Sequence, residues 1–310
     1  MQALIDVILP VFLVIGFGYL AAWKLGLSET GVDGVMKFAQ NFAVPVLLFN
    51  GVARLDLGAV FNWELLVTFY SGAFAGFAVG FLAAMFIFRR PAEDCVAVGF
   101  CCLFSNSLQL GIPITERAFG PEALAPNYAI ISIHAPLLYT FGVIMMELAR
   151  TGGRMTLGTP VAVVRSLAVN PLVIGILLGL AVNFSGLPLP GVVQSAVTMV
   201  ATSAVPAALF GLGGLLVRYR IEGDLRLILT VCVISLTLHP AVTYLMGSRV
   251  FALPHDQFRS AVTTASMPPG VNAYLFASMF GVGMRIAAAS VLIATALAIV
   301  TVWFWLSLLV

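Results

Sequence analysis

The sequence predicts an all-α polytopic membrane protein: ten transmembrane helices form two inverted five-helix repeats, in which helices 4 and 9 are broken and cross. Three observations predict this fold. Hydrophobic residues make up 61% of the 310 residues and charged residues only 9%, whereas a soluble domain is about 25% charged. The apolar runs are long enough for membrane-spanning helices. One constant offset relates the two halves of the chain.

The composition excludes several classes of protein. Fifteen basic and 13 acidic residues are too few to cover a soluble surface, which excludes a soluble enzyme, a disordered chain and a nucleic-acid-binding protein. The 29 glycines, the 16 prolines and the long apolar runs do not fit the alternating strands of an outer-membrane barrel. Helices remain, because they satisfy their own backbone in lipid. The four cysteines have no CxxC spacing, so we expect reduced thiols, no metal site and no cofactor.

The apolar runs define the expected spans, since a helix needs about 20 apolar residues to cross the bilayer. The ten spans are residues 3–23, 34–53, 63–88, 94–116, 127–149, 168–185, 193–217, 225–249, 258–280 and 284–309. We expect a first repeat at 1–149, a linker at 150–167 and a second repeat at 168–310. With the N-terminus outside, 11 basic residues lie on the inner side and four on the outer side. The positive-inside rule therefore predicts a multi-pass protein of the cell (inner or plasma) membrane with both termini outside.

An internal repeat supports the division into halves. Ala43 to Phe49 reads AVPVLLF and recurs as AVPAALF from Ala204 to Phe210, 161 residues later. The same offset relates Pro10 and Pro171, Gly18 and Gly179, Ser105 and Ser266, and Phe119-Gly120 and Phe280-Gly281. Each half holds five spans, an odd number, so the second half must be inverted. Inverted repeats are typical of secondary transporters, whose binding site lies near the midplane.

Helices 4 and 9 carry helix breakers together with polar side chains at mid-span. Proline removes a backbone hydrogen bond and glycine lowers the cost of unwinding. A simple proline kink is the alternative interpretation, but it does not explain costly polar groups at the same depth. The residues expected at the helix crossover are Gly111, Pro113, Pro268, Pro269 and Gly270.

These breaks predict an anion site without a buried cation, because half-helix N-termini present free N–H groups and a partial positive charge. The candidate substrate-binding residues are Ser105, Asn106, Gln109, His134, Asn272 and Asn50. Two of these have an open alternative: His134 could bond a neighbouring carbonyl as a neutral ring, and Asn50 could face a neighbouring helix. The spans hold no acidic pair at mid-depth, so the sequence shows no sodium site made of carboxylates. We expect no catalytic residues.

The stretch from Asn106 to Pro113 resembles the auxin efflux carrier family, which includes plant PIN-type auxin carriers and bacterial permeases assigned to malonate, malate and related acids. Phe42 to Pro45, Pro268 to Tyr274 and the spacing of the ten helices match as well. The resemblance, to the bacterial branch, implies a fold related to bile-acid:sodium symporters. Helices 1, 2, 6 and 7 would form a scaffold that mediates a homodimer. Helices 3–5 and 8–10 would form a transport domain that moves like an elevator.

The resemblance also implies roles for single residues. Asn106 matches the asparagine that contacts the substrate carboxylate in the plant branch, His134 falls near that site, and Pro113 and Pro268 match the crossover prolines. This chain departs from the plant pattern: the charged helix 3 residues are missing, and Asn272 replaces an apolar residue. Auxin itself is therefore not implied.

The leading hypothesis is a secondary transporter, not an enzyme, that moves a small organic anion across the lipid bilayer. The anion would be a mono- or dicarboxylate, auxin-like or malonate/malate-like. One alternative is an intramembrane enzyme that uses Ser105 or Ser107 with His134, although no GxSxG-type nucleophile elbow is present. Another is a channel or a sensor without transport, which saturable flux would distinguish from a carrier.

Overall fold

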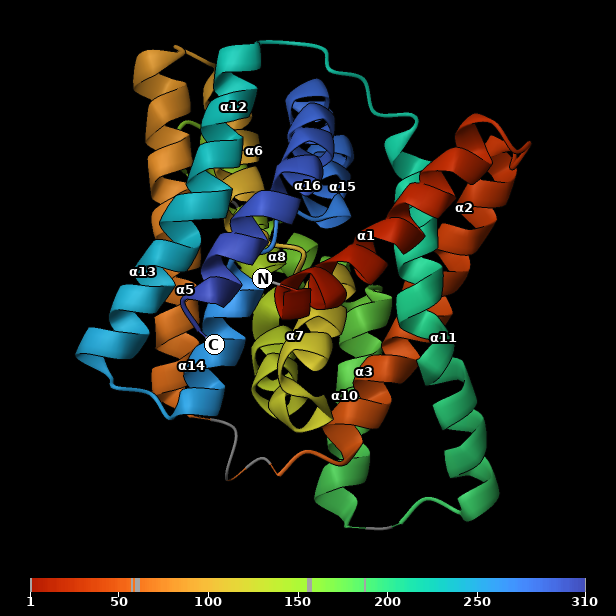
Figure 1. The fold of residues 1–310 in the computed structure, drawn as a ribbon. Coiled ribbons are helices and arrows are strands. Elements are labelled where there is room, and N and C mark those ends of the chain that lie inside the picture. Colours follow the sequence, from red (N-terminus) through yellow and green to blue (C-terminus); the bar gives the residue numbers. More distant parts are fainter. Residues whose placement is uncertain (1, 57, 59–61, 155–157, 187, 310) are drawn as a thin grey trace.

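The protein is all-helical in the computed structural model, which describes residues 2–56, 58, 62–154, 158–186 and 188–309 (Figure 1). The helices of the first half are α1 (Gln2–Trp23), α2 (Glu29–Phe38), η1 (Ala39–Ala43), α3 (Val44–Ala53), α5 (Trp63–Leu82), η2 (Ala83–Ile87), α6 (Ala92–Leu103), η3 (Ser107–Gly111), α7 (Ile112–Phe119), η4 (Pro121–Ala123) and α8 (Leu124–Arg150). Those of the second half are α9 (Gly158–Ala168), α10 (Pro171–Ser185), α11 (Gly191–Leu216), α12 (Leu225–Val233), η5 (Ile234–Leu238), α13 (His239–Leu245), η6 (Met246–Val250), α14 (His255–Ala265), α15 (Val271–Phe280) and α16 (Met284–Ser307).

Seven of the described helices are long and apolar enough to cross a membrane, judged by length and composition. They are Ile5–Trp23, Glu29–Ala53, Trp63–Ile87, Pro121–Arg150, Gly191–Leu216, Leu225–Val250 and Met284–Ser307. Two shorter apolar helices, Pro171–Ser185 and Val271–Phe280, accompany them. Each expected span overlaps one of these helices or a broken pair of shorter ones, and ten membrane crossings in two inverted repeats stay a prediction. The all-helical class is confirmed.

Several helices contain a wide π-turn, and three of these turns directly precede a proline. The segments η1, η3 and η5 end two residues before Pro45, Pro113 and Pro240 respectively. A proline ring clashes with the carbonyl four residues earlier and removes one donor. A π-turn accommodates this by widening the helix locally. The prolines therefore loosen these helices without ending them.

Glycines bring two pairs of helices into close contact. A Cβ placed on Gly18 of α1 would lie 1.9 Å from the carbonyl oxygen of Phe210 in α11. A Cβ placed on Gly179 of α10 would lie 2.9 Å from the carbonyl oxygen of Phe49 in α3. Both partners of the first contact are related to those of the second by the offset of 161 residues. Gly213 approaches Ile15 just as closely, so the glycine-rich stretch of α11 serves close helix packing.

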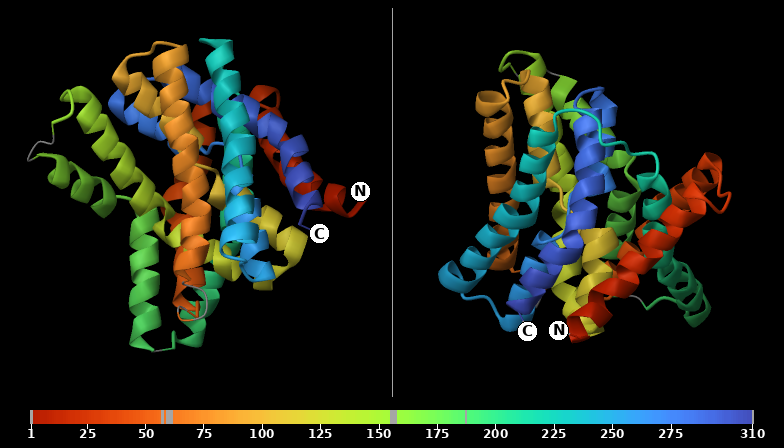
Figure 2. Two further views of the ribbon diagram at one scale, coloured as in Figure 1. Left: turned by 90° about the vertical axis from the view of Figure 1, so that its left-hand side faces the viewer. Right: turned by 45° about the horizontal axis from the view of Figure 1, so that its top comes forward.

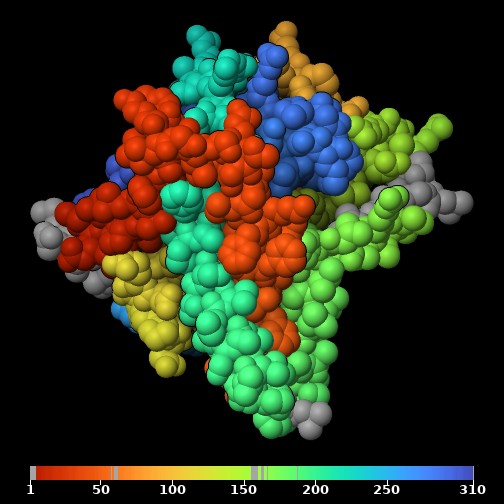
Figure 3. All heavy atoms as spheres, turned by 90° about the vertical axis from the view of Figure 1, so that its right-hand side faces the viewer, coloured from red at the N-terminus to blue at the C-terminus, as the bar shows by residue number. Residues whose placement is uncertain are grey.

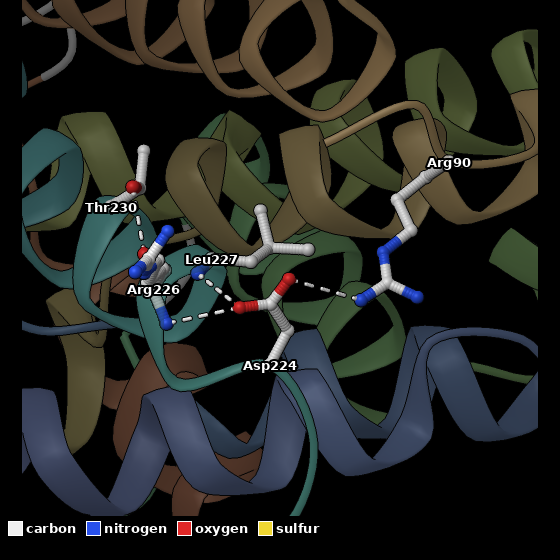
Figure 4. A network of polar contacts seen from close by, with 5 residues as sticks. All are labelled: Arg90, Asp224, Arg226, Leu227 and Thr230. Atoms are coloured by element: carbon white, nitrogen blue, oxygen red, sulfur yellow. Dashed lines mark hydrogen bonds and ion pairs between the residues drawn. The ribbon is translucent and has the colours of Figure 1, made fainter. Parts of the chain in front are cut away.

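Ion pairs gather at the helix ends that the sequence predicts to be cytoplasmic. The pairs are Arg90–Asp224, Arg150–Glu93, Arg218–Asp33, Arg220–Glu222 and Arg285–Glu222. Figure 4 shows that Asp224 has two roles: it accepts from the N–H groups of Arg226 and Leu227 at the start of α12 and pairs with Arg90. The groups are partly exposed, so each pair contributes about 0–1 kcal/mol.

The start of α1 and the end of α16 lie near each other in both views of Figure 2. This arrangement is compatible with an even number of membrane crossings. The region expected to be a linker holds the short helix α9, which packs against α8 and α10. Its 11 residues are too few to cross the bilayer.

Candidate functional site

The two broken helices meet at a backbone crossing. α6 ends at Leu103 and α14 ends at Ala265. The extended segments that follow pair as an antiparallel bridge between Ser105 and Pro269. The N–H of Asn106 donates to the carbonyl of Pro268 at 2.7 Å, and the N–H of Gly270 donates to the carbonyl of Phe104 at 3.1 Å. These bonds satisfy backbone groups that the helix breaks leave free.

The crossing uses some of the expected crossover residues and not others. Pro268, Pro269 and Gly270 lie in it, and a Cβ on Gly270 would lie 3.4 Å from the Cα of Asn106. Gly111 and Pro113 lie instead in the helical segment that follows, at the end of η3 and in the first turn of α7. The break in helix 4 therefore precedes them, because proline is tolerated in the first turn of a helix.

A cavity of about 300 Å³ borders the crossing. Its walls come from η1, α3, α8, the start of α10, and α15. Figure 3 shows the face of the molecule where the orange-red α2–α3 region, the green α10 and the blue α15 come together. Five predicted substrate-binding residues line it: Ser105, Asn106, Gln109, His134 and Asn272. The described residues that line the cavity include no Lys, Arg, Asp or Glu.

Three helix N-termini border this cavity. The helical segment from Ser107 to Phe119, α15 from Val271 and α10 from Pro171 all begin with residues that line it. The first N–H groups of a helix have no intrahelical acceptor and carry a partial positive charge. Asn170 caps α10 by accepting from the N–H of Leu172 at 3.0 Å. The cavity thus offers positive potential without a charged side chain.

The polar side chains at the crossing form hydrogen bonds with one another. The Asn106 Oδ1 accepts from the N–H of Gln109 at 3.2 Å, and its Nδ2 donates to Gln109 Oε1 at 3.4 Å. The hydroxyls of Ser105 and Ser107 lie 2.8 Å apart. The hydroxyl of Tyr139 donates to Asn272 Oδ1 at 3.3 Å, so the NH₂ group of Asn272 remains as a donor for a ligand.

His134 is buried, with 4% of its surface exposed, and its imidazole lies among aromatic rings. The ring centroids of Phe104, Phe69 and Tyr70 lie 4.6, 5.7 and 6.0 Å from that of His134. Neither ring nitrogen has a hydrogen-bond partner within the described structure. A buried polar group without a partner is costly, so His134 is a candidate for bonding a substrate or water in this cavity.

Asn50 does not share this cavity. It lines a second one of about 460 Å³ and accepts from Gln194 Nε2 at 3.0 Å. The predicted set also omitted five polar residues that line the first cavity: Gln40, Asn41, Ser107, Tyr139 and Asn170. Asn41 could have been found from its place four residues before Pro45, two residues ahead of the repeated motif. Tyr139 carries no such signal.

Comparison with known proteins identifies the family. The model of the family described as "Membrane transport protein" matches residues 3–306. The chain belongs to this family, which is that of the auxin efflux carriers. The "Putative malonate transporter" of Rhizobium meliloti (strain 1021) is 26% identical over 97% of this chain and 94% of its own length. "Auxin efflux carrier component 5" of Arabidopsis thaliana is 21% identical over 89% of this chain and 88% of its own.

A third member, "Uncharacterized transporter YfdV" of Escherichia coli (strain K12), is 23% identical over 96% of this chain and 95% of its own length. The resemblance to the auxin efflux carrier family is therefore confirmed. Membership makes this chain a multi-pass membrane transporter.

Proposed function

We propose that this family member is a secondary transporter for a small organic anion, and that the cavity at the crossing is its substrate site. The observation that carries the proposal is the convergence of three helix N-termini on a cavity lined by uncharged polar groups. Such helix ends bind carboxylates well. A carrier benefits from a site without a fixed countercharge, since the substrate must also leave.

The size of the cavity and the named relatives favour a small carboxylate. A volume of about 300 Å³ is at the lower end of the range for ligand pockets. One relative bears the name of a malonate transporter and another that of an auxin carrier. A compact mono- or dicarboxylate of the malonate or malate type fits both observations. Asn106 and Asn272 would donate to its oxygens, and His134 would bond a second polar group.

The glycine contacts support the two-repeat architecture. The Gly18–Phe210 and Gly179–Phe49 contacts are the same contact in two halves, as an inverted repeat requires. They join the elements proposed as the scaffold: α1, α2–α3, α10 and α11. The remaining long helices would form the transport domain, which carries both broken helices in an elevator-type motion. Scaffold helices of two copies would form a homodimer, with both termini of each chain outside.

Uptake measurements test the proposal. We expect purified protein in proteoliposomes to take up radiolabelled malonate saturably, and unlabelled mono- and dicarboxylates to compete. A thermal-shift screen of the same acids identifies the preferred substrate. Linear, non-saturating flux would indicate a channel, and the absence of both binding and flux for all acids would reject the proposal. Chemical conversion of the acid would favour an enzyme.

A further inference from the structure

The second cavity lies against the second half of the broken helix 4, whereas the first cavity lies against the break itself. On the side of the proposed transport domain, most residues that line this cavity belong to α7, among them Ile112, Pro113 and Glu116. On the other side α1, α3 and α11 form the wall. α7 and α15 are the second halves of the two broken helices, and Figure 1 shows them at different heights of the molecule, α15 above α7. The two cavities therefore flank the crossing from different directions.

The scaffold walls of the two cavities are related by the internal repeat. The offset of 161 residues connects a lining residue of the first cavity with a lining residue of the second in six cases: Gln40 with Ala201, Asn41 with Thr202, Val44 with Val205, Leu48 with Leu209, Pro171 with Pro10, and Leu172 with Val11. The repeat was recognised from sequence motifs and the cavities from the structure. This agreement shows that the scaffold wall of the second cavity is the repeat-related counterpart of the scaffold wall of the first cavity.

A polar stripe runs along α11 at this wall. Gln194, Thr198 and Thr202 are spaced four residues apart and so share one helix face. Gln194 Nε2 donates to Asn50 Oδ1 at 3.0 Å and to the hydroxyl of Thr198 at 3.2 Å. Thr198 and Thr202 are exposed. Both hydroxyls donate to backbone carbonyls of α11, Thr198 to Gln194 and Thr202 to Met199. Both threonines also line the second cavity, and polar side chains within membrane-spanning helices usually face protein or a water-filled cavity.

We infer that the second cavity is the outer half of the translocation path. In the opposite transport state, the backbone crossing of the two broken helices lies against the face of α11 that bears Thr198 and Thr202. In that state Thr202 takes the place that Asn41 has in the first cavity. The inference rests on the proposed transport function and adds to it the residues of the second access route. It also assigns Asn50, which the first cavity leaves unexplained, to this route.

Cysteine labelling tests the inference without a known substrate. Thr202→Cys, Thr198→Cys and Asn41→Cys are each treated with a charged, membrane-impermeant thiol reagent, in intact cells and in inside-out vesicles. The four native cysteines are buried and give a low background. Val200→Cys is the matched control, because Val200 lies between the two threonines in depth but on the other side of α11. We expect the threonine positions to react from outside and Asn41→Cys from inside.

The rates decide the outcome. Thr202→Cys and Thr198→Cys should react at least about 10-fold faster than Val200→Cys, because only a water-exposed thiol readily forms the thiolate. Only variants that keep the parent's elution volume and melting temperature are scored. Equal rates at the threonine and valine positions, or reaction of Asn41→Cys and Thr202→Cys from the same side only, would overturn the inference. If the expected pattern appears but no acid is transported, the proposed function fails while the two access routes stand.

Discussion

The backbone N–H of Asn106 donates to the carbonyl oxygen of Pro268 at a distance of 2.7 Å. Two residues that are 162 positions apart are thereby joined where both of their helices are broken. The bond orients Asn106 from its backbone, while its side chain caps the next helical segment. Movement of either broken helix would have to carry the other with it. We therefore expect the two halves of the crossing to move as one body.

Asn106 should contribute strongly to substrate affinity. Asn106→Ala removes a donor to a desolvated anion, which costs about 1.5–3 kcal/mol, or roughly 10- to 100-fold in the dissociation constant. Asn106→Asp keeps the capping oxygen but adds a negative charge, and it should bind the anion more weakly still. Asn272→Ala should resemble Asn106→Ala. Calorimetry with the acid found in the screen measures these changes.

Arg249→Ala serves as the control, since Arg249 is exposed and lines neither of the two cavities described above. The Arg249→Ala variant should bind the acid with the same affinity as the parent protein. Unchanged affinity in both asparagine variants, with both folded, would contradict the site at the crossing. It would direct attention to His134 instead.

His134→Phe should separate binding from stability. The imidazole is buried without a hydrogen-bond partner in the described structure, a situation that costs about 1–3 kcal/mol. Phenylalanine suits the surrounding aromatic rings, so the ligand-free variant should melt about 2 °C higher. Its affinity for the acid should fall about 10-fold, because a hydrogen bond to the substrate is lost. A stable variant with full affinity would show that His134 does not touch the substrate.

Transport should not require sodium. The cavity has no carboxylate among its described lining residues, and carboxylates are among the oxygen ligands that hard cations prefer. Replacement of sodium by potassium or choline on both sides of proteoliposomes should leave uptake unchanged. A membrane potential should drive an uncompensated anion, at about 2.3 kcal/mol per charge per 100 mV. Uptake that stops whenever sodium is removed would refute this prediction.

The close contact between α1 and α11 should tolerate no side chain at Gly18. Gly18→Ala places a methyl group 1.9 Å from the Phe210 carbonyl oxygen, which forces the helices apart and should cost about 1–3 kcal/mol of stability. Gly16→Ala is the matched control two residues away, because nothing lies within 4 Å of its added Cβ. Thermal melting in detergent compares the two variants. Equal melting temperatures would show that the contact can relax freely.

Both ends of the chain should be reachable from outside the cell. The charge distribution predicts this orientation, and the start of α1 lies near the end of α16 (Figure 2). A cysteine at the exposed Ser307 should react with an impermeant reagent in intact cells. Labelling only in inside-out vesicles would reverse the orientation of the whole molecule, including both access routes.

The sequence by itself determined the class of the protein, its family and the positions of its long helices. Apolar length, helix breakers and basic helix ends act locally, so they can be recognised without the fold. The repeat offset of 161 residues did not identify which residues touch, but it relates the Gly18–Phe210 contact to the Gly179–Phe49 contact. The breaks at Ser105 and Pro269 lie in the stretches that the prolines and polar residues marked.

Only the tertiary structure decided which polar side chains share a cavity. Asn41 and Asn50 lie nine residues apart in one continuous helical stretch, but Asn41 lines the first cavity and Asn50 the second. The direction of a side chain depends on how its helix is rotated about its axis, and close packing against neighbouring helices fixes that rotation. The same packing joins Tyr139 to Asn272 across 133 residues and moves the break of helix 4 ahead of Gly111. Such long-range contacts leave no periodic signal in either segment, because each depends on the surface of the other.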